Sequence, residues 1–113
     1  MQEFVLPLAE AFATLQQVTT WIADKSVNDR REAAAAASEY LRLFALVTLG
    51  STWAHMVKTA YAALETTREN QFYEAKIATA RFYMQRLLPQ ASSLAAAIMS
   101  GSRTIMDPDA NAF

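Results

Sequence analysis

Glycine occurs only twice among the 113 residues of this chain, as Gly50 and Gly101. Tight hairpin turns depend on glycine and a few other turn residues, so this chain has little means of building a β-sheet. Alanine, the strongest helix former, makes up about a fifth of the sequence. The sequence therefore predicts an all-α fold, and its length suits a single domain.

Apolar residues recur at three- and four-residue spacing in three long segments, as on the buried faces of helices. The first helix is expected from about Pro7 to about Lys25. The second is expected to open at Asp29, whose spacing to Glu32 is that of a capping box, and to run to about Glu65. The apolar stripe of the first helix comprises Phe4, Leu8, Ala11, Phe12, Leu15, Val18 and Ile22.

The third helix is expected to start near Thr67, after a link so short that it must run antiparallel to the second. Its apolar period continues across Pro89, so the proline is expected to kink the helix without breaking it. Gly101 is placed to end it. Residues 102–113 lack periodicity and are expected to form a flexible tail. The prediction is an up-down-up bundle of three long helices, with a short fourth element as an optional addition.

The second helix is apolar over an arc of roughly 220°, whereas one packing partner covers about 100°. It is therefore expected to lie between two other helices, or between one helix and a partner chain. Gly50 falls within its main seam, although glycine costs a helix about 1 kcal/mol relative to alanine. We therefore expect Gly50 at a helix crossing where another backbone comes close.

Charge and composition exclude several classes of protein. The net charge of −1 provides no basic stripe for nucleic acid, and the absence of cysteine excludes disulfides and thiol catalysis. Acidic Glu3 and the lack of a basic leader argue against a signal peptide, so a cytoplasmic location is expected. The most apolar window, from Tyr40 to Val57, contains Arg42, which is costly inside a bilayer. A buried helix is therefore favoured over a membrane span.

No residues have the spacing of an active site, a cofactor site or a metal site. His55 is the only histidine, and it falls on the polar arc of the second helix, where a surface role is favoured. Phosphate-binding glycine loops and nucleophile elbows are missing. Arg42 falls among leucines, and we interpret it as pairing with Glu39 or extending into solvent. A docking or ligand-binding role for Arg42 is the alternative.

Two groups of apolar residues face away from the expected core. Phe82 points to the outer side of the third helix with Ala75 and Ala78, while Leu41 and Phe44 fall in the polar arc of the second. A large aromatic side chain flanked by alanines is typical of a helix-contact stripe. These five residues are predicted to contact a partner surface. Coverage by the first helix or by the tail is the alternative.

Two segments carry a resemblance to a known family. They are the run Tyr40–Val47 with Gly50 and Trp53–Met56, and the run Phe72–Tyr83 followed by Arg86–Pro89. Together they resemble the C-terminal helical extension of bacterial acyl-CoA dehydrogenases, in a subgroup similar to 3-methylmercaptopropionyl-CoA dehydrogenase. The likeness covers most of the chain and is most specific in the third helix. It implies that the chain is the excised C-terminal domain of a larger enzyme.

Enzymes of this family oxidise acyl-CoA thioesters to enoyl-CoA with a glutamate base and FAD. The domains that carry the base and the flavin precede the extension, so the resemblance assigns FAD to the parent enzyme and no cofactor to this chain. The leading hypothesis is a non-catalytic domain that serves subunit assembly or shapes the acyl-CoA cleft. Its partners would be the rest of the dehydrogenase polypeptide and, in a homo-oligomer, a neighbouring copy. A free-standing helical module that self-associates is the alternative, and a small ligand-binding or catalytic bundle is the least favoured.

Overall fold

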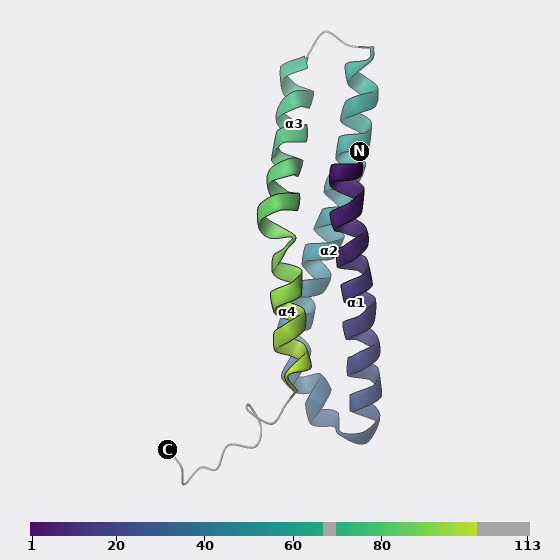
Figure 1. The fold of residues 1–113 in the computed structure, drawn as a ribbon, viewed down its shortest axis with the longest axis vertical. Helices are drawn as coiled ribbons and strands as arrows, with labels where there is room; N and C mark the ends of the chain where they lie inside the picture. The colour runs from purple at the N-terminus through teal and green to yellow at the C-terminus, as the bar shows by residue number, and fades with distance from the viewer. Residues whose placement is uncertain (67–69, 102–113) are drawn as a thin grey trace, which may run out of the picture.

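A computed structural model describes residues 1–66 and 70–101 as a bundle of antiparallel helices (Figure 1). α3, the π-helical segment η1 and α4 follow one another along one path antiparallel to α2, so the three elements act as one bent helix. No strand occurs within the described residues. The all-α, up-down-up prediction is confirmed. The elements are α1 (Gln2–Asn28), α2 (Arg30–Leu64), α3 (Asn70–Phe82), η1 (Tyr83–Leu87) and α4 (Gln90–Met99).

A single residue, Asp29, separates α1 from α2. Its backbone is extended, with φ −151° and ψ 111°. Its carboxylate accepts a hydrogen bond from the Arg31 backbone N–H at 3.0 Å, which caps α2. Its own backbone N–H donates to the Lys25 carbonyl at 3.0 Å, which closes α1. The predicted start of the second helix at Asp29 is confirmed.

The predicted start of the first helix near Pro7 is wrong, because α1 begins at Gln2 and encloses the proline. The N–H groups of Phe4 and Val5 both donate to the Met1 carbonyl at 3.0 Å, which completes a turn before Pro7. Phe4 is fully buried. Burial of its ring contributes about 1.5–3 kcal/mol, which offsets the cost of the proline within the helix.

The third helix bends at the predicted place but does not break. Pro89 has no N–H to donate to the helix ladder, and the Leu88 N–H donates at 2.9 Å to the Tyr83 carbonyl, five residues back. Leu88 and Pro89 both keep right-handed helical dihedral angles, so the apolar stripe continues into α4. Gly101, at φ 89°, follows the last turn as expected. The expected start near Thr67 and the tail lie outside the described residues.

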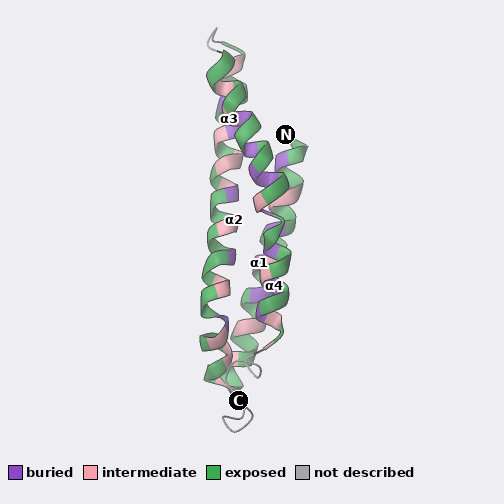
Figure 2. Ribbon diagram, turned by 90° about the vertical axis from the view of Figure 1, so that its left-hand side faces the viewer, coloured by how far each residue is buried: buried purple, intermediate pink, exposed green. Residues whose placement is uncertain are grey.

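Buried residues line the inner sides of the helices, and the core includes Phe4, Val18, Leu43, Val47, Val57 and Met84 (Figure 2). Gly50 is buried among them. A Cβ atom added there would lie 3.2 Å from Leu8 Cδ1, 3.4 Å from Leu88 Cδ1 and 3.5 Å from Tyr83 Cε1. Side chains of α1 and of the bent third helix therefore pack directly onto Gly50, where the helix crossing was expected.

α2 packs against both α1 and the bent third helix, as its wide apolar arc predicts, and α1 also contacts α4 directly. Its length and composition would also allow a membrane span, and only 22% of its most apolar window is buried inside the bundle. The exposed remainder includes Leu41 and Leu49. The two neighbouring helices thus cover only part of the apolar surface of α2.

Candidate functional site

The bend of the third helix brings one polar group into the core. Tyr83 is 5% exposed, and its hydroxyl donates to the backbone carbonyl of Leu46 on α2 at 2.5 Å. A helical carbonyl has two lone pairs, so it can accept this bond besides its main-chain one. Burial disfavours the phenolate and raises the pKa of Tyr83. The bond fixes the π-helical segment against the middle of α2.

Removing the hydroxyl with Tyr83→Phe is expected to lower the free energy of unfolding by about 0.5–1.5 kcal/mol at neutral pH. The raised pKa adds a pH dependence. The protonated phenol contributes its full share to the free energy of unfolding at pH values below its unfolded-state pKa of about 10. This contribution is lost as the pH rises through the higher pKa of the folded state. Urea titrations at pH 7 and about pH 11 test this. If the wild type and Tyr83→Phe lost the same free energy of unfolding between the two pH values, the predicted pH dependence would be contradicted.

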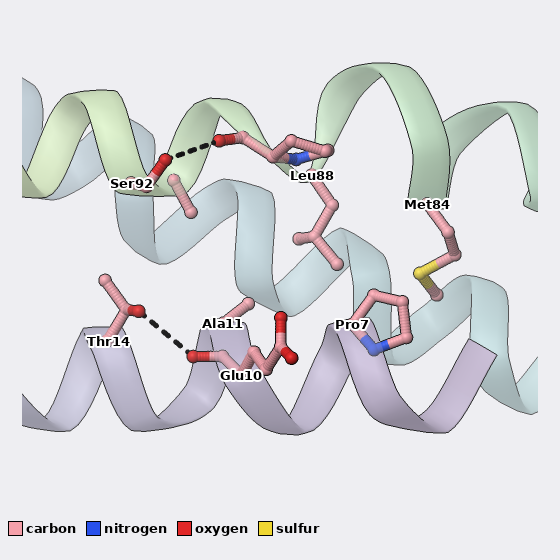
Figure 3. Close-up of a pocket in the computed structure, with 9 residues that line it drawn as sticks. Pro7, Glu10, Ala11, Thr14, Met84, Leu88 and Ser92 are labelled. Atoms are coloured by element: carbon pink, nitrogen blue, oxygen red, sulfur yellow. Dashed lines mark hydrogen bonds between the residues drawn. The ribbon is translucent and has the colours of Figure 1, made fainter. Parts of the chain in front are cut away.

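A hollow of about 210 Å³ lies between α1 and α4 (Figure 3). Two prolines and two alanines are among its lining residues, and their small side chains leave the space between the helices unfilled. Its hydroxyls are already engaged: Thr14 donates to the Glu10 carbonyl at 3.0 Å and Ser92 to the Pro89 carbonyl at 3.0 Å. The Glu10 carboxylate is the one charged group in the lining. One carboxylate without a second acid, a base or a nucleophile supports no catalytic chemistry. The lining residues are Pro7, Glu10, Ala11, Thr14, Met84, Leu88, Pro89, Ala91 and Ser92.

A second hollow, which we call the α2–α3 groove, has a volume of about 330 Å³. α2 contributes hydroxyl, imidazole and apolar side chains, and α3 contributes two aromatic rings and a lysine. This groove was not predicted from the sequence. The one available signal was that residues 40–64 contain basic side chains and no Asp or Glu. Its lining residues are Thr52, His55, Met56, Thr59, Ala60, Phe72, Tyr73 and Lys76.

Arg42 is exposed and lines a third hollow, of about 220 Å³, with Gln90 of α4. Within the described part of the chain, no ion pair joins it to Glu39. The structure thus gives no support to the Arg42–Glu39 pair, and Arg42 is exposed. Its docking or ligand-binding role stays a prediction.

The described residues include one well-formed ion pair between helices distant in sequence. The Arg81 guanidinium donates to both carboxylate oxygens of Glu3, at 2.9 Å and 2.8 Å. This hydrogen bonding lowers the pKa of Glu3 and raises that of Arg81. Both side chains are well exposed, so the pair orients the start of α1 against α3 and adds little stability.

The predicted interface residues are all exposed in this structure. Leu41 and Phe44 lie on α2, at 69% and 50% exposure, while Ala75, Ala78 and Phe82 lie on α3, with Phe82 at 56%. α1 therefore does not bury Phe82. Whether a partner contacts either group stays a prediction.

Other exposed apolar side chains were not singled out by the sequence pattern. Phe12 was placed in the buried stripe of the first helix, yet it is 43% exposed, because that stripe is wider than the surface that α2 and α4 cover. Val5, Leu6 and Phe72 are exposed as well. Periodicity identifies the apolar side of a helix, but the width of the covered arc depends on its neighbours.

The described residues contain no group of three or more His, Asp or Glu side chains that could hold a metal ion. The described residues form a helical bundle that leaves apolar side chains exposed on α1, α2 and α3. Residues 1–109 match the family model described as "Acetyl-CoA dehydrogenase C-terminal like", and the chain belongs to this family. No curated protein sequence matches the chain.

The family match confirms the predicted relationship to the C-terminal part of acyl-CoA dehydrogenases. The subgroup similar to 3-methylmercaptopropionyl-CoA dehydrogenase stays a prediction. The runs that carried the resemblance lie on α2 and on the bent third helix. The match extends beyond them to include α1.

Proposed function

We propose that this chain is the non-catalytic C-terminal domain of an FAD-dependent, cytoplasmic acyl-CoA dehydrogenase, and that it serves subunit assembly. The observation that carries the proposal is the family match over residues 1–109. In this proposal the parent enzyme oxidises acyl-CoA to enoyl-CoA, and its other domains hold FAD and the catalytic base. Shaping of the acyl-CoA cleft is the second form that the role could take.

The uncovered apolar stripe of α3 supports the assembly role. Phe82 is exposed, and Ala75 and Ala78 lie seven and four positions before it on the same helix face. Small side chains beside a large aromatic one let a second helix approach closely. We propose that this stripe packs against a second copy of the domain or against the dehydrogenase body.

The reading frame upstream of Gln2 in the source genome tests the parent enzyme directly. A continuous frame that encodes a dehydrogenase is the expected result. A stop codon directly before the domain would favour the free-standing, self-associating module instead.

Phe82→Glu is expected to reduce self-association of the purified chain, because a carboxylate buried at a helix contact is strongly destabilising. Light scattering over a concentration series should show association in the wild type and a monomer in the variant. Leu49→Glu is the matched control, since it places the same charge on an exposed apolar site of α2. A strictly monomeric wild type would contradict self-association. Equal effects of the two variants would contradict the assignment to α3.

A further inference from the structure

We propose that the α2–α3 groove is a binding site for an amphiphilic anion, namely an unbranched alkyl monocarboxylate of moderate chain length. The proposal stands on the lining of the groove alone and does not depend on the role of the domain in a dehydrogenase. It assigns the alkyl chain to the apolar floor and the carboxylate to the polar rim.

The floor of the groove is apolar and aromatic. Its apolar lining consists of Met56 and Ala60 from α2 and of Phe72 and Tyr73 from α3. The two rings pack edge to face, with centroids 5.3 Å apart, which gives one wall of the groove a defined shape. Pockets for drug-sized ligands range from about 300 to 1,000 Å³. A groove of about 330 Å³ is therefore suited to a short chain.

Among the described residues that line the groove, Lys76 carries a positive charge and none carries a carboxylate. Lys76 is half-buried, and its ammonium lies 5.3 Å from the centre of the Phe72 ring. Within the described residues this cation–π contact is the only interaction of Lys76, which has no acidic partner. α2 adds His55 to the rim and contains no Asp or Glu from residue 40 to residue 64. A negative head group would supply the charge that this rim lacks.

The hydroxyls of the groove are unequal as donors. Thr52 gives its hydrogen to the Thr48 carbonyl at 3.1 Å and is therefore not available to an anion. Thr59, one helical turn beyond His55, makes no hydrogen bond within the described part of the chain. Thr59, His55 and Lys76 are thus the donors for a carboxylate, and they line the groove together with its apolar and aromatic side chains. The presence of Met56, Ala60, Phe72 and Tyr73 in the same lining favours an amphiphile over a small inorganic anion.

Titration of the full 113-residue chain with hexanoate, octanoate and decanoate, followed by amide NMR shifts, tests the proposal. We expect saturable shifts confined to residues 52–60 and 72–76, and a Kd that falls several-fold with each added pair of methylenes. The uncharged counterpart 1-hexanol should bind more weakly than hexanoate. Acetate, which lacks the chain, should not bind.

Lys76→Gln is expected to raise the Kd of octanoate about two- to five-fold, the range that a partly exposed ion pair provides. The matched control is Lys58→Gln, because Lys58 is an exposed lysine of α2 that does not line the groove. It should leave the Kd unchanged. The dispersion of the amide spectrum verifies that each variant is folded.

Three outcomes would overturn the proposal. Shifts spread over the exposed stripes around Leu41 and Phe82 would indicate non-specific hydrophobic binding. Equal affinity for hexanoate and 1-hexanol, or equal effects of Lys76→Gln and Lys58→Gln, would remove the role of charge. No saturable binding of any carboxylate would mean that the groove is not a ligand site and would favour a protein surface as its partner.

Discussion

Phe4→Ala is expected to lower the free energy of unfolding by about 3–5 kcal/mol, the cost of removing a buried phenylalanine from a packed core. Phe4 lies in the first turn of α1, only three residues from the start of the chain, yet its ring is completely buried. End residues normally fray and contribute little. A large effect at this position would show that the first turn is part of the cooperative core.

The matched control for Phe4 is its neighbour Val5, which is 49% exposed on the same turn. Val5→Ala is expected to change stability by no more than about 0.5 kcal/mol. Urea unfolding followed by far-UV circular dichroism measures both variants. If Phe4→Ala cost as little as Val5→Ala, the first turn would not be docked, and the start of α1 would belong nearer Pro7, where the sequence placed it.

Gly50→Leu is expected to lower the free energy of unfolding by about 1–3 kcal/mol through overpacking. The space beside the glycine is occupied by the side-chain ends of Leu8, Leu88 and Tyr83. All three would have to move to admit a leucine, and Tyr83 is held by its bond to the Leu46 carbonyl. The variant therefore tests whether three helices meet at this position.

Gly50→Ala separates packing from helix propensity. A single methyl group at 3.2 Å from Leu8 Cδ1 requires only a small shift of a flexible side chain, while alanine favours the helix by about 1 kcal/mol over glycine. We expect these two contributions nearly to cancel. Ala62→Leu, at an exposed site of the same helix, should leave stability almost unchanged. A tolerated Gly50→Leu would contradict the crossing, and thermal unfolding would show it.

Helix periodicity, capping residues and proline were sufficient to predict most of this fold. Asp29 opens α2 and Pro89 accompanies the bend of the third helix, because a cap and a missing donor act locally. The start of α1 was missed because it depends on the burial of Phe4, which is a tertiary effect. The exposure of Phe12 was missed for the same reason, since it depends on where the neighbouring helices stop covering α1.

The candidate sites could be predicted to a smaller extent. The outward-facing positions of Leu41, Phe44 and Phe82 follow from helical angles alone, and these residues are exposed. The α2–α3 groove could not be located, because pairing Thr52 and His55 with Phe72 and Lys76 requires the register between two helices. Sequence spacing defines a face within one helix but not the register between two.

The one-residue connection at Asp29 also bears on how the chain folds. Closing a loop costs less entropy the shorter the loop, and contacts between α1 and α2 on either side of Asp29 join residues close in sequence. Helical proteins dominated by such local contacts fold in microseconds to milliseconds. The α1–α2 hairpin can therefore form first, and the third helix can then pack against the apolar side of this hairpin. Folding in that order would leave the third helix as the last element to pack.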